Sequence, residues 1–149
     1  MPFEPGRQLY FLHMHMDHVQ GVRVVQQHFN EERDSLYQIE VPGKVRPMVL
    51  LWERRENERR VFAVLKKTRS RNRLIPGLYV VYVENDRASF VDCSRWYEYS
   101  DTVRSHSDGG EAQRLPERVW RKVLQKLPQP VRDYVTEAEL QHRMRSQRA

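Results

Sequence analysis

Cysteine is almost absent from this chain of 149 residues, in which Cys93 is the single example. One cysteine cannot form a disulfide within its own chain, so a disulfide framework is excluded. Such sparse usage agrees with the reducing environment of the cytoplasm. A lone cysteine is more often a small buried apolar residue than a nucleophile, and we interpret Cys93 in that way.

Long apolar runs are missing as well. No segment approaches the roughly 20 apolar residues that a membrane-spanning helix needs, so we expect no membrane partner. The opening residues, 1–6, lack the basic and apolar regions of a signal peptide. With 39% apolar and 31% charged residues, the sequence predicts a cytoplasmic protein with one well-solvated domain.

Positive charge is concentrated in the middle of the chain. Residues 1–43 carry net charge −3, residues 44–73 carry +8, residues 74–112 carry −4 and residues 113–149 carry +5, which gives +6 in all. A basic block flanked by acidic segments indicates a polyanionic partner, and nucleic acid is the first candidate. The alternative is a solvated basic face without a partner.

Alternating and β-branched apolar residues predict several short strands followed by a helix. We expect strands over 8–16, 48–52, 60–65, 78–84, 88–92 and 96–103, a basic loop over 69–76, and helical spacing over 115–127. This order predicts an α+β fold that is mainly β: a small SH3-like barrel, or strongly bent antiparallel sheet, with a C-terminal helix.

The domain boundaries follow from these elements. We place the barrel domain at 1–130, with a long loop insertion at 17–43, and a partly frayed helical extension at 131–149. No internal repeat is visible in the sequence.

Three short pieces occur in an order that resembles the PemK/MazF-like toxins, which are small ribonucleases of toxin–antitoxin systems. Arg46-Pro47 opens an apolar strand, the next strand ends at Thr68, and a later strand ends at Asp92. The resemblance spans most of residues 6–127. The chain departs from the family pattern in its long first loop, in a Val-Asp-Cys sequence where the family has a Cys-Asp-Gln-like stretch, and in its tail.

The resemblance implies cleavage of single-stranded RNA by a homodimer that an acidic cognate antitoxin silences. RNA carries its own nucleophile, the 2′-hydroxyl, so the reaction needs no metal or other cofactor. Arg46 would bind the phosphate oxygens through its planar fork of donors. Thr68 would add a hydroxyl donor, and Asp92 would orient Arg46 or recognise a base edge. Each of the three also has a purely structural interpretation, as a solvated arginine or a turn residue.

Further cations near these positions would contact the RNA backbone and give the binding a steep salt dependence. They are Lys44, Lys66, Lys67, Arg69, Arg71, Arg73 and Arg95. Trp96, Tyr97 and Tyr99 offer rings for stacking on unpaired bases, and at least one of them is expected in the core instead.

A second motif indicates a different chemistry. His13, His15, Asp17 and His18 form a His-x-His-x-Asp-His string, which looks like the metal-binding signature of the metallo-β-lactamase superfamily. Imidazole and carboxylate groups at this spacing suit zinc, so a zinc-dependent hydrolase is an alternative. A third hypothesis is a non-catalytic SH3-like module that binds nucleic acid or protein. We rank the metal-independent ribonuclease first, because the superfamily's later ligands and longer chain are missing.

Overall fold

The computed structural model describes residues 3–14, 43–100 and 113–148, and for residues 10–14, 43–46 and 100 it describes the backbone alone. Six strands and two helices lie within these segments. They are β1 (Gln8–Met14), β2 (Gly43–Glu56), β3 (Arg59–Thr68), β4 (Tyr79–Glu84), β5 (Arg87–Asp92), β6 (Tyr97–Ser100), α2 (Glu117–Lys126) and α3 (Gln129–Arg148). Each predicted strand is present, so the prediction of an α+β fold that is mainly β is confirmed. The predicted loop at 17–43 lies almost wholly outside the described residues.

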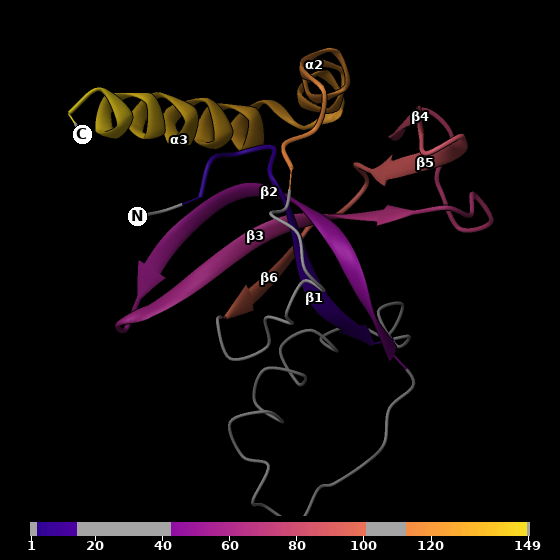
Figure 1. Cartoon of the computed structure of the whole chain (residues 1–149), viewed down its shortest axis with the longest axis horizontal. Helices are drawn as coiled ribbons and strands as arrows, with labels where there is room; N and C mark the ends of the chain where they lie inside the picture. Colours follow the sequence, from indigo (N-terminus) through magenta and orange to yellow (C-terminus); the bar gives the residue numbers. More distant parts are fainter. Residues whose placement is uncertain (1–2, 15–42, 101–112, 149) are drawn as a thin grey trace, which may run out of the picture.

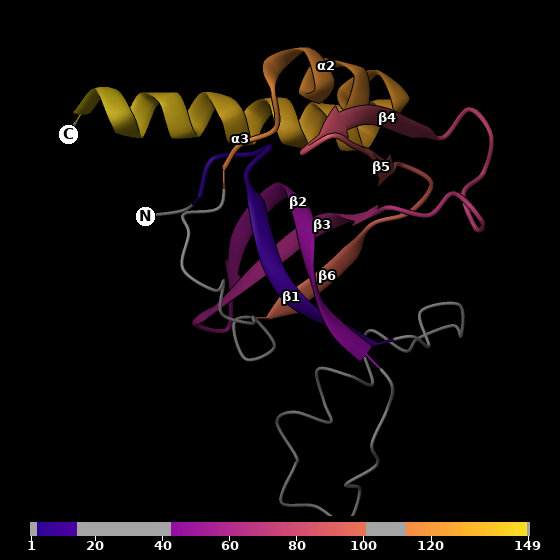
Figure 2. The same cartoon turned by 45° about the vertical axis from the view of Figure 1, so that its right-hand side comes forward.

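The long strand β2 joins two parts of the sheet. Its first half pairs antiparallel with β1, and its second half pairs with β3 from Met48 to Glu56. A β-bulge interrupts the second pairing between Leu50 and Trp52. Bulges bend a strand and increase its twist, and β2 curves strongly across the molecule (Figures 1 and 2).

The sheet is strongly bent but is not closed into a barrel by the strands described. Their order is β1-β2-β3-β5-β4, with β6 also paired to β3. The edge of β3 away from β2 is divided, because Val61–Val64 pair with β6 and only Lys67 and Thr68 pair with β5. The β4–β5 hairpin therefore diverges from the rest, and β1 and β4 remain at separate edges. Of the two forms predicted, an SH3-like barrel or a strongly bent antiparallel sheet, the described strands form the bent sheet.

The two faces of the sheet carry separate apolar clusters. One cluster fills the space between the sheet and both helices, and its fully buried helical residues are Trp120 and Val123 of α2 and Val135 of α3. The second lies on the opposite face and is built from Leu9, Met48, Leu50, Phe62, Val64, Tyr97 and Tyr99. Alternation along β2 and β3 sends successive side chains to the two clusters.

The two helices follow the sheet and lie on one side of it (Figures 1 and 2). The predicted helix at 115–127 is observed as α2. Residues 131–148 of the predicted extension lie in α3, which spans Gln129–Arg148.

Two tight turns set the hairpin registers. Asn57 and Glu58 both have positive φ between β2 and β3, as do Asn85 and Asp86 between β4 and β5. Two consecutive left-handed residues are typical of type I′ turns, whose twist matches that of the flanking strands.

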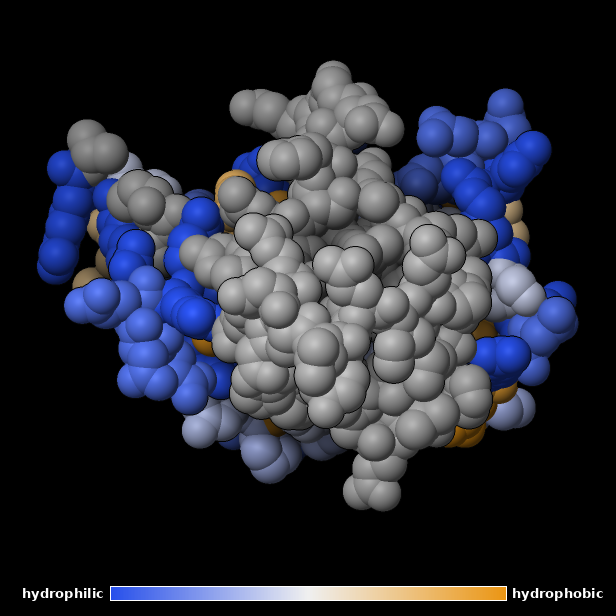
Figure 3. Space-filling model, turned by 90° about the horizontal axis from the view of Figure 1, so that it is seen from below, coloured by the Kyte–Doolittle hydropathy of each residue, from blue (hydrophilic) through white to orange (hydrophobic). Residues whose placement is uncertain are grey.

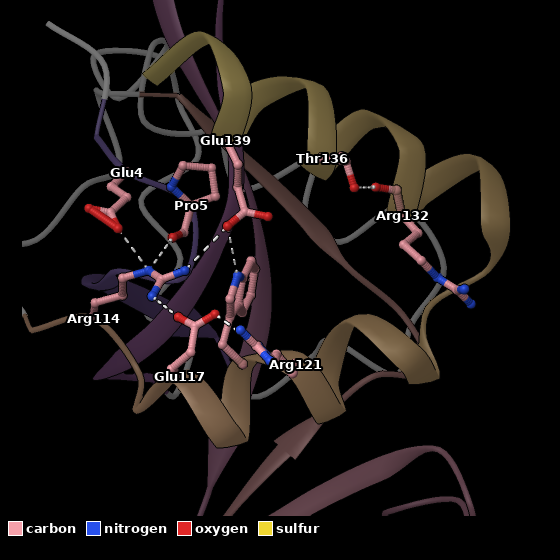
Figure 4. A network of polar contacts seen from close by, with 9 residues as sticks. Glu4, Pro5, Arg114, Glu117, Arg121, Arg132, Thr136 and Glu139 are labelled. Atoms are coloured by element: carbon pink, nitrogen blue, oxygen red, sulfur yellow. Dashed lines mark hydrogen bonds and ion pairs between the residues drawn. The ribbon is translucent and has the colours of Figure 1, made fainter. Parts of the chain in front are cut away.

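The segment before β1 is bonded to the segment before α2. Gly6 N–H donates to the Leu50 carbonyl at 2.7 Å, and Leu115 N–H donates to the Gly6 carbonyl at 2.9 Å. Arg114 then joins the early chain to both helices, because it binds Glu4, Glu117 and Glu139 (Figure 4). The indole N–H of Trp120 donates to the same Glu139 carboxylate at 3.2 Å.

Candidate functional site

Thr68 and Asp92 come together where β3 meets β5. Thr68 pairs with Phe90 in the ladder, and Asp92 lies two residues beyond Phe90 on β5. Paired residues and alternate residues share a face, so both side chains lie on the same face of the sheet. Tyr79 completes this corner, because it pairs with Asp92 and its ring meets that of Phe90 edge-on at 5.7 Å.

Both polar groups also hold the start of a loop. The Thr68 hydroxyl oxygen accepts a hydrogen bond from Ser70 N–H at 3.2 Å. Asp92 Oδ1 accepts from Ser94 N–H at 2.9 Å and from the Ser94 hydroxyl at 2.6 Å. These are the local turns that Thr and Asp side chains commonly form. Asp92 is buried and Thr68 is half-buried.

Arg46 approaches this corner through its backbone position on β2. It pairs with Phe11, and two residues later Met48 pairs with Lys66 of β3. The ladder between β2 and β3 begins at that pair, and the part of β2 that holds Arg46 is paired with β1 instead. Lys44 pairs with His13 still further from the corner. The side chains of Arg46 and Lys44 lie outside the description.

The loop between β3 and β4 carries exposed positive charge. Arg69, Arg71 and Arg73 are all exposed, as is Arg95 beyond Asp92, while Lys66 is half-buried. The loop extends at one end of the molecule, beside the β4–β5 hairpin (Figure 2). The structure thus brings most of the predicted RNA-binding cations to the end of the sheet that holds Thr68 and Asp92.

Lys67, which we expected among the RNA-binding cations, is not exposed with the others. Its side chain is 5% exposed and points to the other face of β3, where Nζ donates to Gln8 Oε1 at 2.5 Å and to Glu84 Oε1 at 2.6 Å. The Tyr82 hydroxyl donates to the second oxygen of Glu84 at 2.8 Å. Lys67 is therefore part of a buried polar cluster beneath the loop, and its ammonium group does not join the exposed cations.

The charges within this cluster affect one another. Burial lowers the pKa of Lys67, against the opposing effect of its bond to Glu84, and nearby Arg69 lowers it further. Burial alone would raise the pKa of Glu84, but the hydrogen bonds from Lys67 and Tyr82 outweigh it and hold that pKa below its ordinary value. The pKa of the Tyr82 hydroxyl is raised, chiefly by burial and then by its bond to Glu84. Lys67 and Glu84 thus form a buried ion pair beside Arg69.

Sequence patterns did not identify Gln8, Tyr82 and Glu84 as the groups that surround Lys67. One feature of the sequence did indicate that Lys67 is buried. Lys67 lies on the same face of β3 as Leu65 and Ala63, which are fully buried. A cation at that position of a strand needs a buried partner, but its identity depends on which strands are neighbours.

The aromatic residues near β6 divide between core and surface. Tyr97 and Tyr99 are buried in the second apolar cluster, whereas Trp96 is 37% exposed and its ring lies 6.5 Å from that of Trp52. The expectation that at least one of the three rings belongs to the core is confirmed. Trp96 is the one whose ring is accessible for stacking.

The alternative metal site falls mostly outside the described residues. His13 is described by its backbone alone, and His15, Asp17 and His18 lie beyond the described range. Within the described segments, no group of three or more His, Cys, Asp or Glu side chains is arranged to hold a metal ion. Cys93 is buried, as expected, and burial, together with the charge of Asp92, raises the pKa of its thiol to about 12.

Comparison of the chain with protein-family models, curated proteins and solved structures found no match. In the described segments, neither helix has the length and apolar character needed to cross a membrane.

Proposed function

We propose that this protein is a metal-independent endoribonuclease that cleaves single-stranded RNA. One observation carries the proposal: Thr68 and Asp92 share one face at the β3–β5 junction, next to a loop with exposed arginines. An SH3-like architecture and membership of the PemK/MazF-like toxins are parts of the same proposal.

The proposed chemistry uses the RNA's own 2′-hydroxyl. Its oxygen attacks the adjacent phosphorus, the bond to the 5′-oxygen breaks, and a cyclic phosphate and a 5′-hydroxyl are formed. Negative charge accumulates on the phosphate oxygens, so Arg46 stabilises the transition state and Thr68 donates a further hydrogen bond. Asp92 orients Arg46 or reads a base edge. The exposed Arg69, Arg71 and Arg73 bind flanking phosphates, and Trp96 offers a stacking surface.

The open edge of β4 supports a homodimer. The hydrogen bond from Cys93 N–H to the Leu78 carbonyl fixes the alternation of the β4–β5 ladder, so the backbone groups of Tyr79, Val81 and Val83 point away from β5. The Val81 and Val83 side chains are 50% and 76% exposed. An uncharged open edge is a site for strand pairing, and a second copy can pair there symmetrically about Val81. An acidic antitoxin would be attracted by the neighbouring arginines.

A non-catalytic nucleic-acid-binding module is the second candidate. One observation favours it: the Thr68 hydroxyl and the Asp92 carboxylate are both bonded to the turns that they begin. The same basic loop would serve this module without any chemistry.

The decisive experiment measures cleavage of a single-stranded RNA in EDTA, alongside the same RNA with 2′-deoxy nucleotides throughout. We expect the RNA to be cut in EDTA and the deoxy strand to stay intact. Binding of both strands without cleavage would instead support the non-catalytic module. Loss of activity in EDTA, with recovery on adding zinc, would support the His13–His18 hydrolase, because activated water would then be the nucleophile.

A further inference from the structure

The last part of α3 stands apart from the rest of the molecule. The buried residues of this helix, Val131 and Val135, lie in its first half. Among the described residues, Glu139 is the last of α3 with a polar contact to another element, through Arg114 and Trp120. Beyond it, the described hydrogen bonds stay within the helix, as between the Ser146 hydroxyl and the His142 carbonyl. Figure 1 shows this end of α3 extending past the sheet. We call residues 140–148 the α3 tip.

The α3 tip carries positive charge and no negative charge. Arg143, Arg145 and Arg148 are exposed, and no Asp or Glu occurs between 140 and 148. Leu140 and Met144 are each 45% exposed and lie one turn apart, so they form a short apolar strip between the arginines. Arginines in a last turn interact favourably with the helix dipole, which accounts for Arg145 and Arg148 but not for the strip or for Arg143.

A projecting helix end has little to stabilise it in water. At 1.5 Å per residue the α3 tip is about 14 Å long, and helical segments shorter than about 12–15 residues are marginal unless they pack against something. A bound partner would supply that packing. The α3 tip itself has no carboxylate, and Glu139, one turn before Arg143, is already bonded to Arg114 and Trp120. The three guanidinium groups therefore fit a polyanion, and their planar forks match phosphate oxygens best.

We propose that the α3 tip is a second nucleic-acid contact, which binds the phosphodiester backbone while Leu140 and Met144 cover sugar or base surface. This inference rests on the proposed function, because that function identifies the bound polymer as RNA. The α3 tip and the loop that carries Arg69, Arg71 and Arg73 lie at opposite ends of the molecule (Figure 1). Hydrophilic residues gather at both of these ends when the molecule is viewed from below (Figure 3). The second contact therefore engages a separate stretch of a long strand.

The test compares the full chain with Arg143→Gln/Arg145→Gln/Arg148→Gln. Binding of a 2′-O-methyl RNA of about 40 nucleotides, which 2′-hydroxyl attack cannot cut, is measured by fluorescence anisotropy between 50 and 300 mM salt. Each lost phosphate contact lowers the slope of log K against log[salt] by about 0.7 for single strands, so the triple variant should lose about 2. A duplex of the same length distinguishes single-stranded from double-stranded preference.

The matched control is Arg118→Gln/Lys122→Gln/Lys126→Gln, which removes the same charge from exposed positions of α2. Its slope should change by less than half as much. Equal slopes for the two triple variants, or no change in the α3 variant, would overturn the proposal. So would oligonucleotide binding unaffected by the α3 substitutions alongside lost binding to phosphatidylserine vesicles, which would point to a membrane surface instead.

The outcomes separate this inference from the ribonuclease proposal. A parent that cleaves RNA, with an α3 variant of unchanged slope, refutes the second contact alone. A parent that never cleaves, with a slope that depends on the α3 arginines, refutes the enzyme alone. Failure of the parent to bind either oligonucleotide refutes both. Circular dichroism of each variant verifies that the fold is intact, and hydrogen exchange of residues 140–148 should slow when the oligonucleotide binds.

Discussion

The ammonium group of Lys67 lies 2.6 Å from the carboxylate of Glu84, and the lysine side chain is 5% exposed. This ion pair fastens the end of β4 to β3, where the ladder between β3 and β5 has only two residue pairs. It therefore holds the β4–β5 hairpin against the rest of the sheet, directly beneath the loop that carries the exposed arginines.

Breaking this pair from one side should destabilise the protein. Lys67→Met leaves the Glu84 carboxylate partly buried without its cation, and we expect a loss of about 2–3 kcal/mol in the free energy of unfolding, somewhat below the range for fully buried pairs. Urea denaturation measures the change. Lys67→Met/Glu84→Gln should lose less than the sum of the two single variants; strict additivity would mean that the two side chains are not coupled.

Stability should fall in acid, and Glu84 should contribute to the fall. Its pKa in the folded protein is lowered below the ordinary value of 4.5. A depressed carboxyl pKa stabilises the fold at pH values above the unfolded pKa, and that contribution is lost as the pH falls through the folded value. The same direction holds for Glu117, whose pKa is lowered chiefly by its hydrogen bond from Arg114. Thermal unfolding between pH 7 and pH 3 should show a shallower decline for Glu84→Gln than for the parent.

Substitutions at Arg46 and Thr68 should reduce RNA cleavage to different degrees. Arg46→Ala should reduce RNA cleavage by about 10²–10³-fold, the scale for removing one group that stabilises transition-state charge. Thr68→Ala should lose less, because a neutral hydroxyl stabilises the phosphate more weakly. Single-turnover cleavage rates measure both, and unfolding midpoints close to that of the parent are the control. Parent-like cleavage by both variants would show that this corner is not the active site.

Charge on the open edge of β4 should prevent the proposed dimer. Val81→Lys introduces a cation that two copies paired symmetrically about position 81 would place directly opposite its equivalent, and like charges in that position repel. Sedimentation equilibrium at micromolar concentration should give a dimer for the parent and a monomer for this variant. Gln125→Lys, at an exposed position of α2, is the control and should remain dimeric. A monomeric parent would contradict the dimer proposal.

Two glycines with similar backbones should respond differently to alanine. Gly6 and Gly77 have φ of +88° and +83°, and a Cβ at Gly6 would lie 3.1 Å from the Trp120 ring, whereas a Cβ at Gly77 meets nothing within 4 Å. Gly77→Ala should lose about 1 kcal/mol of stability, the strain of a left-handed alanine. Gly6→Ala carries the same strain and also displaces Trp120, so its loss should be clearly larger. Chemical denaturation measures the free energy of unfolding of both variants. The difference between their losses is the steric cost of the contact with Trp120.

Local patterns predicted the strands and turns better than their arrangement. The turn at Asn85 is of the kind that local sequence specifies, because Asn adopts positive φ readily, and its φ is +52°. The β2–β3 hairpin extends further than predicted, because its charged residues are paired: Arg60 binds Glu53 across the hairpin at 2.7 Å, and Arg54 binds Glu98 of β6 at 3.1 Å. Charged residues in sequence indicate a turn, and only the pairing reveals that they belong to strands.

The candidate site was predictable in part. Thr68 and Asp92 were expected at strand ends, and they lie on one face because β3 and β5 are neighbours. That neighbourhood depends on long-range pairing, which no local pattern specifies. The burial of Lys67 was missed for the same reason, since its partner Glu84 lies on β4, which is two strands away in the sheet.

The bonds that join Gly6 to Leu115 have a consequence for the order in which the chain folds. The β2–β3 and β4–β5 hairpins bring together residues that are close in sequence, and such hairpins form within microseconds. The Gly6–Leu115 contact must close a loop of more than one hundred residues before Trp120 can pack over Gly6. Contacts so distant in sequence slow folding, so this closure should be the final and rate-limiting event, after both hairpins have formed.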